Sequence, residues 1–336
     1  MLNTETLYSY EDVAIKPAVL SNVQSRSECN PYLEDGKLPI FTAPMSTVVN
    51  LDNREKFEEN NIYTILPRNI DFEERYNSAI QGKWAAFSLN EFIDNFCNPH
   101  QNNNTENVWK VLIDIANGHM RKLYDVVKES KKIHGDKIQI MVGNIANPET
   151  YEVCCNAGAD YVRISIGTGC GCITTSNTGI GYPIASLLDK MYPIKLKYMK
   201  SGFYTKVIAD GGIRNFDDVT KALALGADYV MIGGLFASMK ESAGETIEIN
   251  GKPHKVFFGM ASKEGQIAIN GEKTKTSEGI KKLLPITCSL KKWSKNMSAY
   301  MRSVMSYCNV TDIKDFNATN ITVNVVSNNA KKSINK

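Results

Sequence analysis

Short runs of apolar residues recur along the chain at nearly even spacing, and each run has the length of a buried strand. Most of them are apolar at consecutive positions, which is typical of parallel strands that are covered on both faces. Charged, amphipathic segments of helical length lie between them, for example Arg121–His134 and Asn215–Leu225. The runs lie at Pro39–Ala43, Tyr63–Leu66, Trp84–Ser88, Val111–Ile115, Ile138–Val142, Tyr161–Ser165, Lys206–Asp210 and Tyr229–Ile232.

This alternation of strand and helix, repeated eight times without a wide gap, predicts an α/β fold of the (β/α)8 TIM barrel type. A doubly wound open sheet is the alternative. We expect residues 1–316 to form one barrel domain, with a mobile flap after the eighth strand and an apolar-faced helix at Trp293–Tyr307. The segment 317–336 is rich in Asn, Ser and Lys. It is predicted to be disordered or to become ordered on a neighbouring subunit.

Composition narrows the class of protein. The 336 residues carry 39 Lys and Arg against 36 Asp and Glu, a formal net charge of +3. Such a balance does not predict a nucleic-acid-binding surface. The chain has no apolar run long enough to span a membrane and no secretory leader pattern, so we expect no membrane contact. Its eight cysteines are scattered without metal-ligand spacing, which favours a reducing, cytoplasmic compartment.

Polar residues and glycines follow the predicted strands, where a barrel enzyme carries its chemistry. Gly211-Gly212 follows the seventh strand and Gly233-Gly234 the eighth, which matches the usual position of a phosphate site in this fold. Asp210, at the end of the seventh strand, would accept hydrogen bonds from ribose hydroxyls. We therefore expect a nucleoside monophosphate ligand. The alternative is that these residues only form tight turns.

A glycine-rich loop follows the sixth strand and ends in a thiol. Within Ile164–Thr175, three glycines precede Cys172, and Thr174 and Thr175 follow it. This pattern is typical of an exposed nucleophile held above a cradle of backbone N–H groups. The alternative is a flexible loop with two ordinary free cysteines.

Several motifs, in order and without large gaps from about Tyr10 to about Cys308, resemble the IMP dehydrogenase/GMP reductase family. The motifs are Tyr10-Glu11-Asp12-Val13, Ser25-Arg26-Ser27-Glu28, Ala43-Pro44-Met45-Ser46-Thr47-Val48, Val142-Gly143-Asn144, the Cys172 loop, Ile208-Ala209-Asp210-Gly211-Gly212-Ile213-Arg214 and Gly259-Met260-Ala261-Ser262. The chain resembles the reductase branch, because only Asn69–Lys83 lies where dehydrogenases usually carry CBS domains. Its flap, at about Ile267–Leu284, also lacks the Arg-Tyr pair of the dehydrogenases.

The resemblance implies reductive deamination of GMP to IMP and ammonia with NADPH, through a thioimidate on Cys172. It assigns the proton for the departing ammonia to Thr174, which works with a glutamate of the flap. Lys263 stands at the expected position of this glutamate, and Glu264 follows it. We take Glu264 as the third catalytic residue, on the assumption of a one-residue shift.

The resemblance also implies binding sites for the nucleotide, the cofactor and a monovalent cation such as potassium, and a homotetrameric assembly. Asn117 would hold the nicotinamide carboxamide, and Arg68 would steer a cofactor phosphate; their alternatives are a strand-end turn and a surface ion pair. The candidates are Ser46, Asp210, Gly211, Gly212, Gly233, Gly234, Gly259, Met260 and Ser262 for substrate; Arg68, Asp114, Asn117 and Gly118 for cofactor; and Gly167, Gly169 and Cys172 for the cation.

Four residues around the expected nucleotide depart from the family pattern. They are Ser46 for an aspartate, Thr168 for a proline, Cys170 for a phosphate-binding serine and Ile173 for a threonine. These changes leave open a deoxynucleotide or an altered purine as substrate. They also leave open two other functions: an oxidising, IMP dehydrogenase-like enzyme without CBS domains, and a catalytically silent purine-nucleotide-binding protein.

Overall fold

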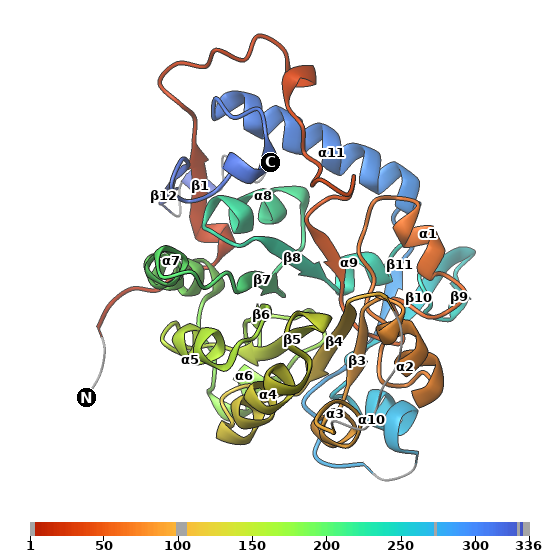
Figure 1. Cartoon of the computed structure of the whole chain (residues 1–336). Coiled ribbons are helices and arrows are strands. Elements are labelled where there is room, and N and C mark those ends of the chain that lie inside the picture. The colour runs from red at the N-terminus through yellow and green to blue at the C-terminus, as the bar shows by residue number, and fades with distance from the viewer. Residues whose placement is uncertain (1–3, 99–105, 272–273, 328–329, 332–336) are drawn as a thin grey trace.

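Seven parallel strands form one curved sheet at the centre of the molecule (Figure 1). The computed structural model describes residues 4–98, 106–271, 274–327 and 330–331. Along the sheet the strands follow the order β2-β8-β7-β6-β5-β4-β3. Their bounds are β2 Ile40–Thr42, β3 Ala85–Phe87, β4 Trp109–Asp114, β5 Ile138–Ile145, β6 Tyr161–Ile164, β7 Lys206–Asp210 and β8 Tyr229–Ile232.

Residues 63–66 close this sheet into a barrel. Tyr63 forms a parallel bridge with Phe41 of β2, and Leu66 forms one with Ala85 of β3. The segment therefore joins the two outer strands of the sheet, although each side makes only a single bridge. The predicted second strand thus lies where it was expected, but it does not form a regular ladder of hydrogen bonds with its neighbours. Closure confirms the (β/α)8 barrel and excludes the open doubly wound sheet.

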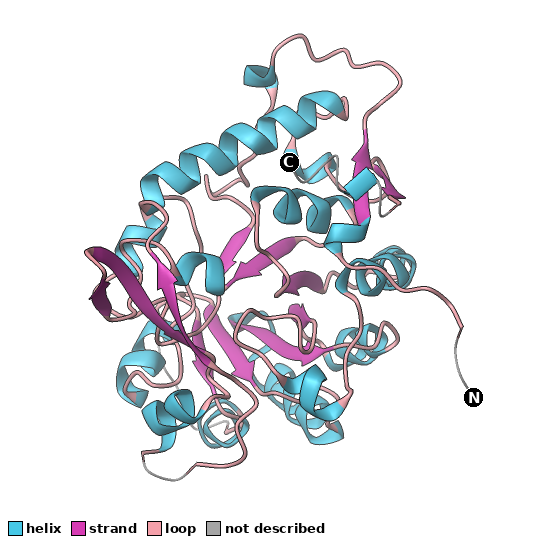
Figure 2. Cartoon of the chain, turned by 180° about the vertical axis from the view of Figure 1, so that it is seen from behind, coloured by secondary structure: helices cyan, strands magenta, loops and turns pink. Residues whose placement is uncertain are grey.

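Helices surround the barrel in the order that the sequence predicts (Figures 1 and 2). Trp293 shows how they pack: its ring stacks on Phe216 with centroids 5.6 Å apart and meets Phe236 edge-on at 4.8 Å. No described helix is long and apolar enough to cross a membrane. The main helices are α1 Arg54–Glu58, α2 Phe72–Ile80, α3 Leu89–Phe96, α4 Arg121–His134, α5 Thr150–Ala157, α7 Ile184–Lys200, α8 Phe216–Ala224, α9 Gly234–Ala237 and α11 Leu290–Tyr307.

Side chains alternate along each barrel strand between the helix layer and the interior. On β4, Val111 and Ile113 pack under the helices, whereas Leu112 belongs to the separate cluster inside the barrel. Aromatic rings fill the amino end of this interior: Phe41 stacks on Tyr63 at 4.8 Å, and other rings surround them. Because this end is filled, the space left for a ligand lies at the carboxyl ends of the strands.

The flap after β8 is a three-stranded antiparallel sheet rather than a plain loop. It consists of β9 Thr246–Ile249, β10 Lys252–Phe258 and β11 Lys281–Pro285, with helix α10 Lys263–Asn270 between the last two. The register pairs Phe257 of β10 with Lys282 of β11. This pairing fixes which flap side chains share a face.

The tail differs from its prediction. Strand β12 (Thr322–Val325) pairs antiparallel with β1 (Val13–Lys16) of the same chain. The physical reason is the alternation in Ile321–Val325: Ile321 is buried and Val323 packs against the core. This β-branched pattern forms a short strand despite the polar composition of the segment. Residues 328–329 and 332–336 lie outside the described ranges.

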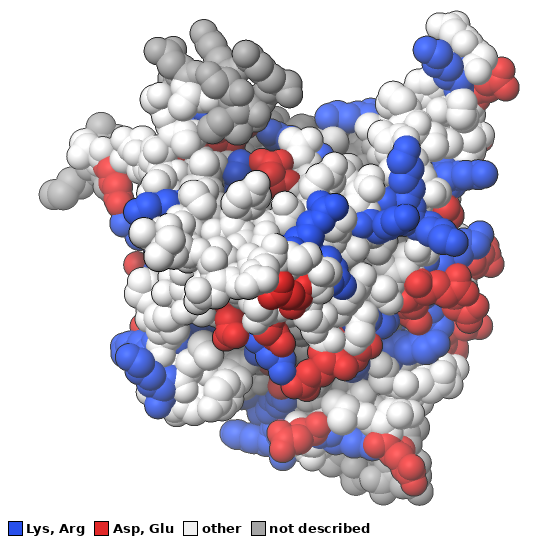
Figure 3. Space-filling model, turned by 90° about the horizontal axis from the view of Figure 1, so that it is seen from above, with Lys and Arg blue, Asp and Glu red and all other residues white. Residues whose placement is uncertain are grey.

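Charged side chains of both signs are interleaved on the face seen in Figure 3. Lys and Arg do not form a continuous basic stripe on this face, which agrees with the balanced net charge of +3.

Candidate active site

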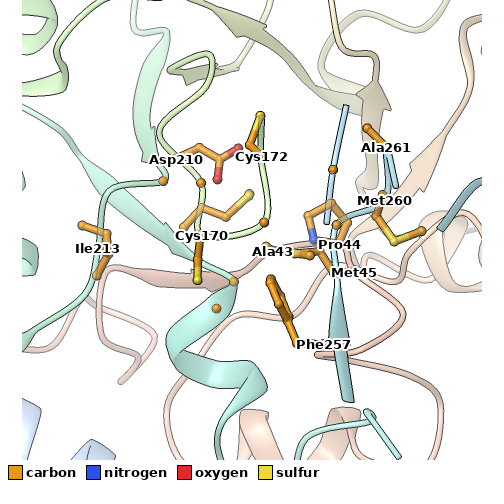
Figure 4. A pocket seen from close by; sticks show the side chains of 18 of the residues that line it. Ala43, Pro44, Met45, Cys170, Cys172, Asp210, Ile213, Phe257, Met260 and Ala261 are labelled. Carbon is orange, nitrogen blue, oxygen red and sulfur yellow. The ribbon is translucent and has the colours of Figure 1, made fainter. Parts of the chain in front are cut away.

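A cavity opens where the barrel strands end and the flap covers them. Its volume is about 870 Å³, including the space open to solvent. Figure 4 shows Cys170, Cys172 and Asp210 close together on one side, with Met260 and Ala261 across from them. The lining residues are Ala43, Pro44, Met45, Asp114, Arg163, Gly169–Cys172, Asp210–Ile213, Met231, Gly233, Gly234, Phe257, Gly259–Ala261, Glu278 and Gly279.

A buried arginine forms the floor of this cavity. Arg163 lies on β6 and points into the barrel, where its guanidinium contacts Asp114 Oδ1 at 2.7 Å and Asp210 Oδ2 at 2.8 Å. Burial lowers the pKa of Arg163, but the two carboxylates outweigh burial and raise it above its ordinary value. Asn144 also donates to Asp210 Oδ2, at 2.7 Å. Because all these described contacts use Oδ2, Asp210 Oδ1 remains available to accept a hydrogen bond from a ligand.

Three side chains form a hydrogen-bonded chain at the cavity wall. The Cys172 thiol donates to Thr174 Oγ1 over 3.3 Å, and the Thr174 hydroxyl donates to Glu278 Oε2 over 2.6 Å. The second distance is short for a hydrogen bond between a hydroxyl and a carboxyl oxygen. The chain therefore connects the thiol to a proton acceptor through a hydroxyl.

The flap holds Glu278 in place through its backbone. Ile173 N donates to Glu278 O at 2.9 Å, and Ile280 N donates to Gly171 O at 3.1 Å. These bonds form an antiparallel bridge between Cys172 and Gly279. Position 279 requires glycine, since a Cβ there would lie 2.8 Å from Ser262 N. The loop and the flap thus form one backbone-linked unit around the thiol.

The prediction of Glu264 as the partner of Thr174 is corrected. Glu264 lies in the first turn of α10 and is not among the residues that line the cavity. Lys263, which begins the same helix, is exposed. The carboxylate at Thr174 belongs to Glu278, which the antiparallel flap brings back to the loop. The gapless comparison of sequences failed here because the flap folds back on itself.

Seven of the nine predicted substrate residues line the cavity, namely Asp210, Gly211, Gly212, Gly233, Gly234, Gly259 and Met260. The two others do not. Ser46 lies behind Met260, with its hydroxyl 3.6 Å from the Met260 sulfur. Ser262 is fully buried and accepts a hydrogen bond from Gly265 N, so it caps α10 instead of facing a ligand.

Two of the residues that depart from the family pattern, Thr168 and Ile173, form hydrogen bonds that hold the Cys172 loop. Thr168 Oγ1 is 2.5 Å from Ser165 Oγ, and its carbonyl accepts from Gly212 N at 3.2 Å. Thr168 thus links the Cys172 loop to the turn after β7. The hydrogen bond from Ile173 to Glu278 O comes from the Ile173 backbone N–H. A change of its side chain therefore leaves this hydrogen bond intact.

The predicted cofactor residues divide into two groups. Asp114 lines the cavity, and Arg68 donates to the Asp114 carbonyl at 3.4 Å. Arg68 Nε and Asn69 Oδ1 are buried and have no hydrogen-bond partner among the described residues. Such unpaired buried atoms suit a polar ligand. Asn117, in contrast, accepts from His119 N, and Gly118 N donates to Asn144 O at 2.8 Å, so these groups are already engaged in the turn.

The predicted cation residues Gly167, Gly169 and Cys172 all lie in the glycine-rich loop after β6. The Gly169 carbonyl accepts from Cys172 N at 3.0 Å, and a carbonyl oxygen has a second lone pair that a cation can use. Among the described residues, no group of three or more His, Cys, Asp or Glu is arranged to hold a metal ion. All eight cysteines are free thiols.

Two residues of the site were missed in the sequence. Arg163 interrupts an apolar strand, Tyr161-Val162-Arg163-Ile164, at an inward-facing position, and a charge there signals a buried ion pair. Glu278 stands directly before Gly279, a carboxylate beside a glycine in the flap. That signal is weak without the pairing of strands.

Comparisons with known proteins agree with this site. The family model for the IMP dehydrogenase / GMP reductase domain matches residues 97–334. A protein named GMP reductase from Staphylococcus epidermidis is 35% identical over 321 residues, covering 92% of this chain and 93% of its own. A GMP reductase from Staphylococcus aureus is 33% identical over 329 residues, with 92% and 93% covered. The barrel and these matches together show that the chain belongs to the IMP dehydrogenase/GMP reductase family.

Proposed function

We propose that the protein is an NADPH-dependent oxidoreductase that converts GMP to IMP and ammonia. The observation that carries this proposal is the hydrogen-bonded chain from the Cys172 thiol through Thr174 to Glu278. A purely binding protein has no need for a thiol connected to a carboxylate at the wall of its cavity. The relatives named GMP reductase support the choice of reaction.

The geometry suggests how the protons move. Glu278 accepts the thiol proton through Thr174, and the Cys172 thiolate then bonds to C2 of the purine. The protonated Glu278 returns the proton through Thr174 to the departing amino group, and the C2–N bond breaks to release ammonia. A thioimidate between Cys172 and C2 remains. General acid–base transfer of this kind accelerates reactions by about 10²- to 10⁴-fold.

NADPH, when bound, supplies a hydride to C2, which allows the C2–S bond to break and frees IMP. The residues that fit the cofactor are Arg68 and Asp114, next to the buried atoms of Arg68 and Asn69 that have no hydrogen-bond partner among the described residues. Asp210 would accept a hydrogen bond from the ribose of GMP with its free Oδ1. The glycine pairs after β7 and β8 leave room for the phosphate.

A nucleotide panel tests the proposal. We expect the purified protein to consume NADPH with GMP and to form an equal amount of IMP. Cys172→Ala should bind GMP but form no product. Parallel reactions with dGMP and NADPH, and with IMP and NAD, define the substrate and the direction. Production of NADH from IMP without NADPH consumption from GMP would instead support the dehydrogenase-like alternative.

The proposal includes three expectations from the family resemblance. They are a homotetramer, a cytoplasmic location and a potassium ion at the carbonyls of Gly167, Gly169 and Cys172. Light scattering tests the first. Replacement of potassium by lithium in the assay buffer tests the third, because the larger ion fits a site of several carbonyl oxygens.

A further inference from the structure

The cavity carries an excess of negative charge before any ligand enters. Its lining contains three carboxylates, Asp114, Asp210 and Glu278, and one guanidinium, Arg163. Both aspartates pair with that arginine. A nucleotide phosphate adds further negative charge, so a cation beside the phosphate would offset the repulsion from the carboxylates. A residue next to the cavity can supply it.

Lys282 on β11 is placed to supply this charge. It pairs with Phe257 across the antiparallel sheet, so both side chains lie on one face. Phe257 lines the cavity, and its ring would lie 2.9 Å from a Cβ on Gly171. The Lys282 ammonium reaches the same loop, where it donates to the Cys170 carbonyl at 2.9 Å and lies 3.9 Å from the Cys170 sulfur.

The ammonium is free to bind an anion. In the part of the chain that the structure describes, its partners are the carbonyl and sulfur of Cys170, and neither carries a carboxylate charge. An ammonium has three donors, so at least one remains unused. Cys170 in turn adjoins the glycine turns, since a Cβ on Gly234 would lie 2.8 Å from Cys170 Cβ. Lys282 therefore stands beside the expected phosphate position.

We infer that Lys282 is a substrate-binding residue that contacts the 5′-phosphate, where Cys170 offers no hydroxyl. This inference rests on the proposed function only in taking a purine nucleoside monophosphate as the ligand. It assigns to the flap strand β11 the role of recognising the phosphate.

Titration calorimetry with GMP and guanosine, in the absence of NADPH, tests the inference. We expect Lys282→Met to weaken GMP binding about tenfold or more, because a hydrogen bond to a charged group is lost. Guanosine binding should change less than about twofold, and Lys282→Arg should restore most of the GMP affinity. The matched control is Lys281→Met, which removes the neighbouring exposed charge from the same strand.

The outcomes separate the two claims. Equal losses for GMP and guanosine would mean that Lys282 only tethers the flap, and no loss for either would also overturn the inference. Binding of GMP that depends on Lys282, without any turnover, would sustain the inference and refute the reductase. Absence of GMP binding to the unmodified protein would refute both.

Discussion

The substitution of glutamine for Glu278 tests the proposed site most sharply. Glu278→Gln keeps the shape of the side chain but removes its ability to accept a proton. The Thr174 hydroxyl, 2.6 Å away, would then donate to a neutral amide oxygen or turn away. Because both proton transfers pass through this carboxylate, we expect kcat to fall by about 10²- to 10⁴-fold.

KM for GMP should change little, since the backbone bonds between Ile173, Gly171 and the flap do not involve the Glu278 side chain. Glu264→Gln is the matched control, a glutamate in the first turn of α10 that does not line the cavity. We expect its kcat to stay within about twofold. Steady-state rates at saturating GMP and NADPH give both values. A large fall in Glu264→Gln with little change in Glu278→Gln would refute the assignment.

Three further variants test other parts of the structure. Arg163→Met leaves Asp114 and Asp210 without their cation and should lower the free energy of unfolding, measured in urea, by about 3–5 kcal/mol. A loss below about 1 kcal/mol would mean that the two ion pairs of Arg163 do not stabilise the fold. His119 is exposed, but partial desolvation lowers its pKa below 6.5. The folded protein should therefore lose stability as pH falls through this value, and the melting temperature of His119→Gln should fall less between about pH 7.5 and about pH 5. An unchanged pH profile would argue against this prediction. Gly167 has a φ of +83°, and a Cβ there would lie 1.7 Å from Thr175 Oγ1. Gly167→Ala should therefore displace the loop and reduce kcat about 100-fold, with little change in the circular dichroism spectrum. Full activity of this variant would show that the loop adapts.

The apolar runs predicted the barrel because its strands are buried on both faces. The predicted run Lys206–Asp210 coincides with β7, and Tyr229–Ile232 coincides with β8. The second run, at Tyr63–Leu66, was found at the right place, although it makes only single bridges to its two neighbours. Buried strands can be recognised in the sequence by their apolar residues, whereas the regularity of the hydrogen bonds between strands cannot.

The flap shows where sequence reasoning stops. Its strands are half exposed, and the burial of β11 alternates between exposed and intermediate positions. Nothing in that pattern tells which strand it pairs with. The register between Phe257 and Lys282, and with it the return of Glu278 to Thr174, arises from long-range pairing. A residue-by-residue comparison therefore selected Glu264, which is nearer to the Gly259–Ser262 motif in sequence.

Buried charge was also hard to predict. Arg163 is a single charged residue within an apolar strand, and its partners Asp114 and Asp210 come from two other strands. Alternation along the strands places all three inside the barrel only after the register is known. The tail strand β12 was missed for a related reason, because its polar neighbours conceal a four-residue alternation.

The central claim is that hydride reaches the purine carbon from which the amino group has left. The most direct measurement is mass and NMR analysis of the IMP formed from GMP with NADPH that is deuterated at both C4 positions. The account predicts one deuterium at C2 of IMP, one equivalent of ammonia and no product from Cys172→Ala. IMP without deuterium, or labelled IMP from the Cys172→Ala protein, would contradict it.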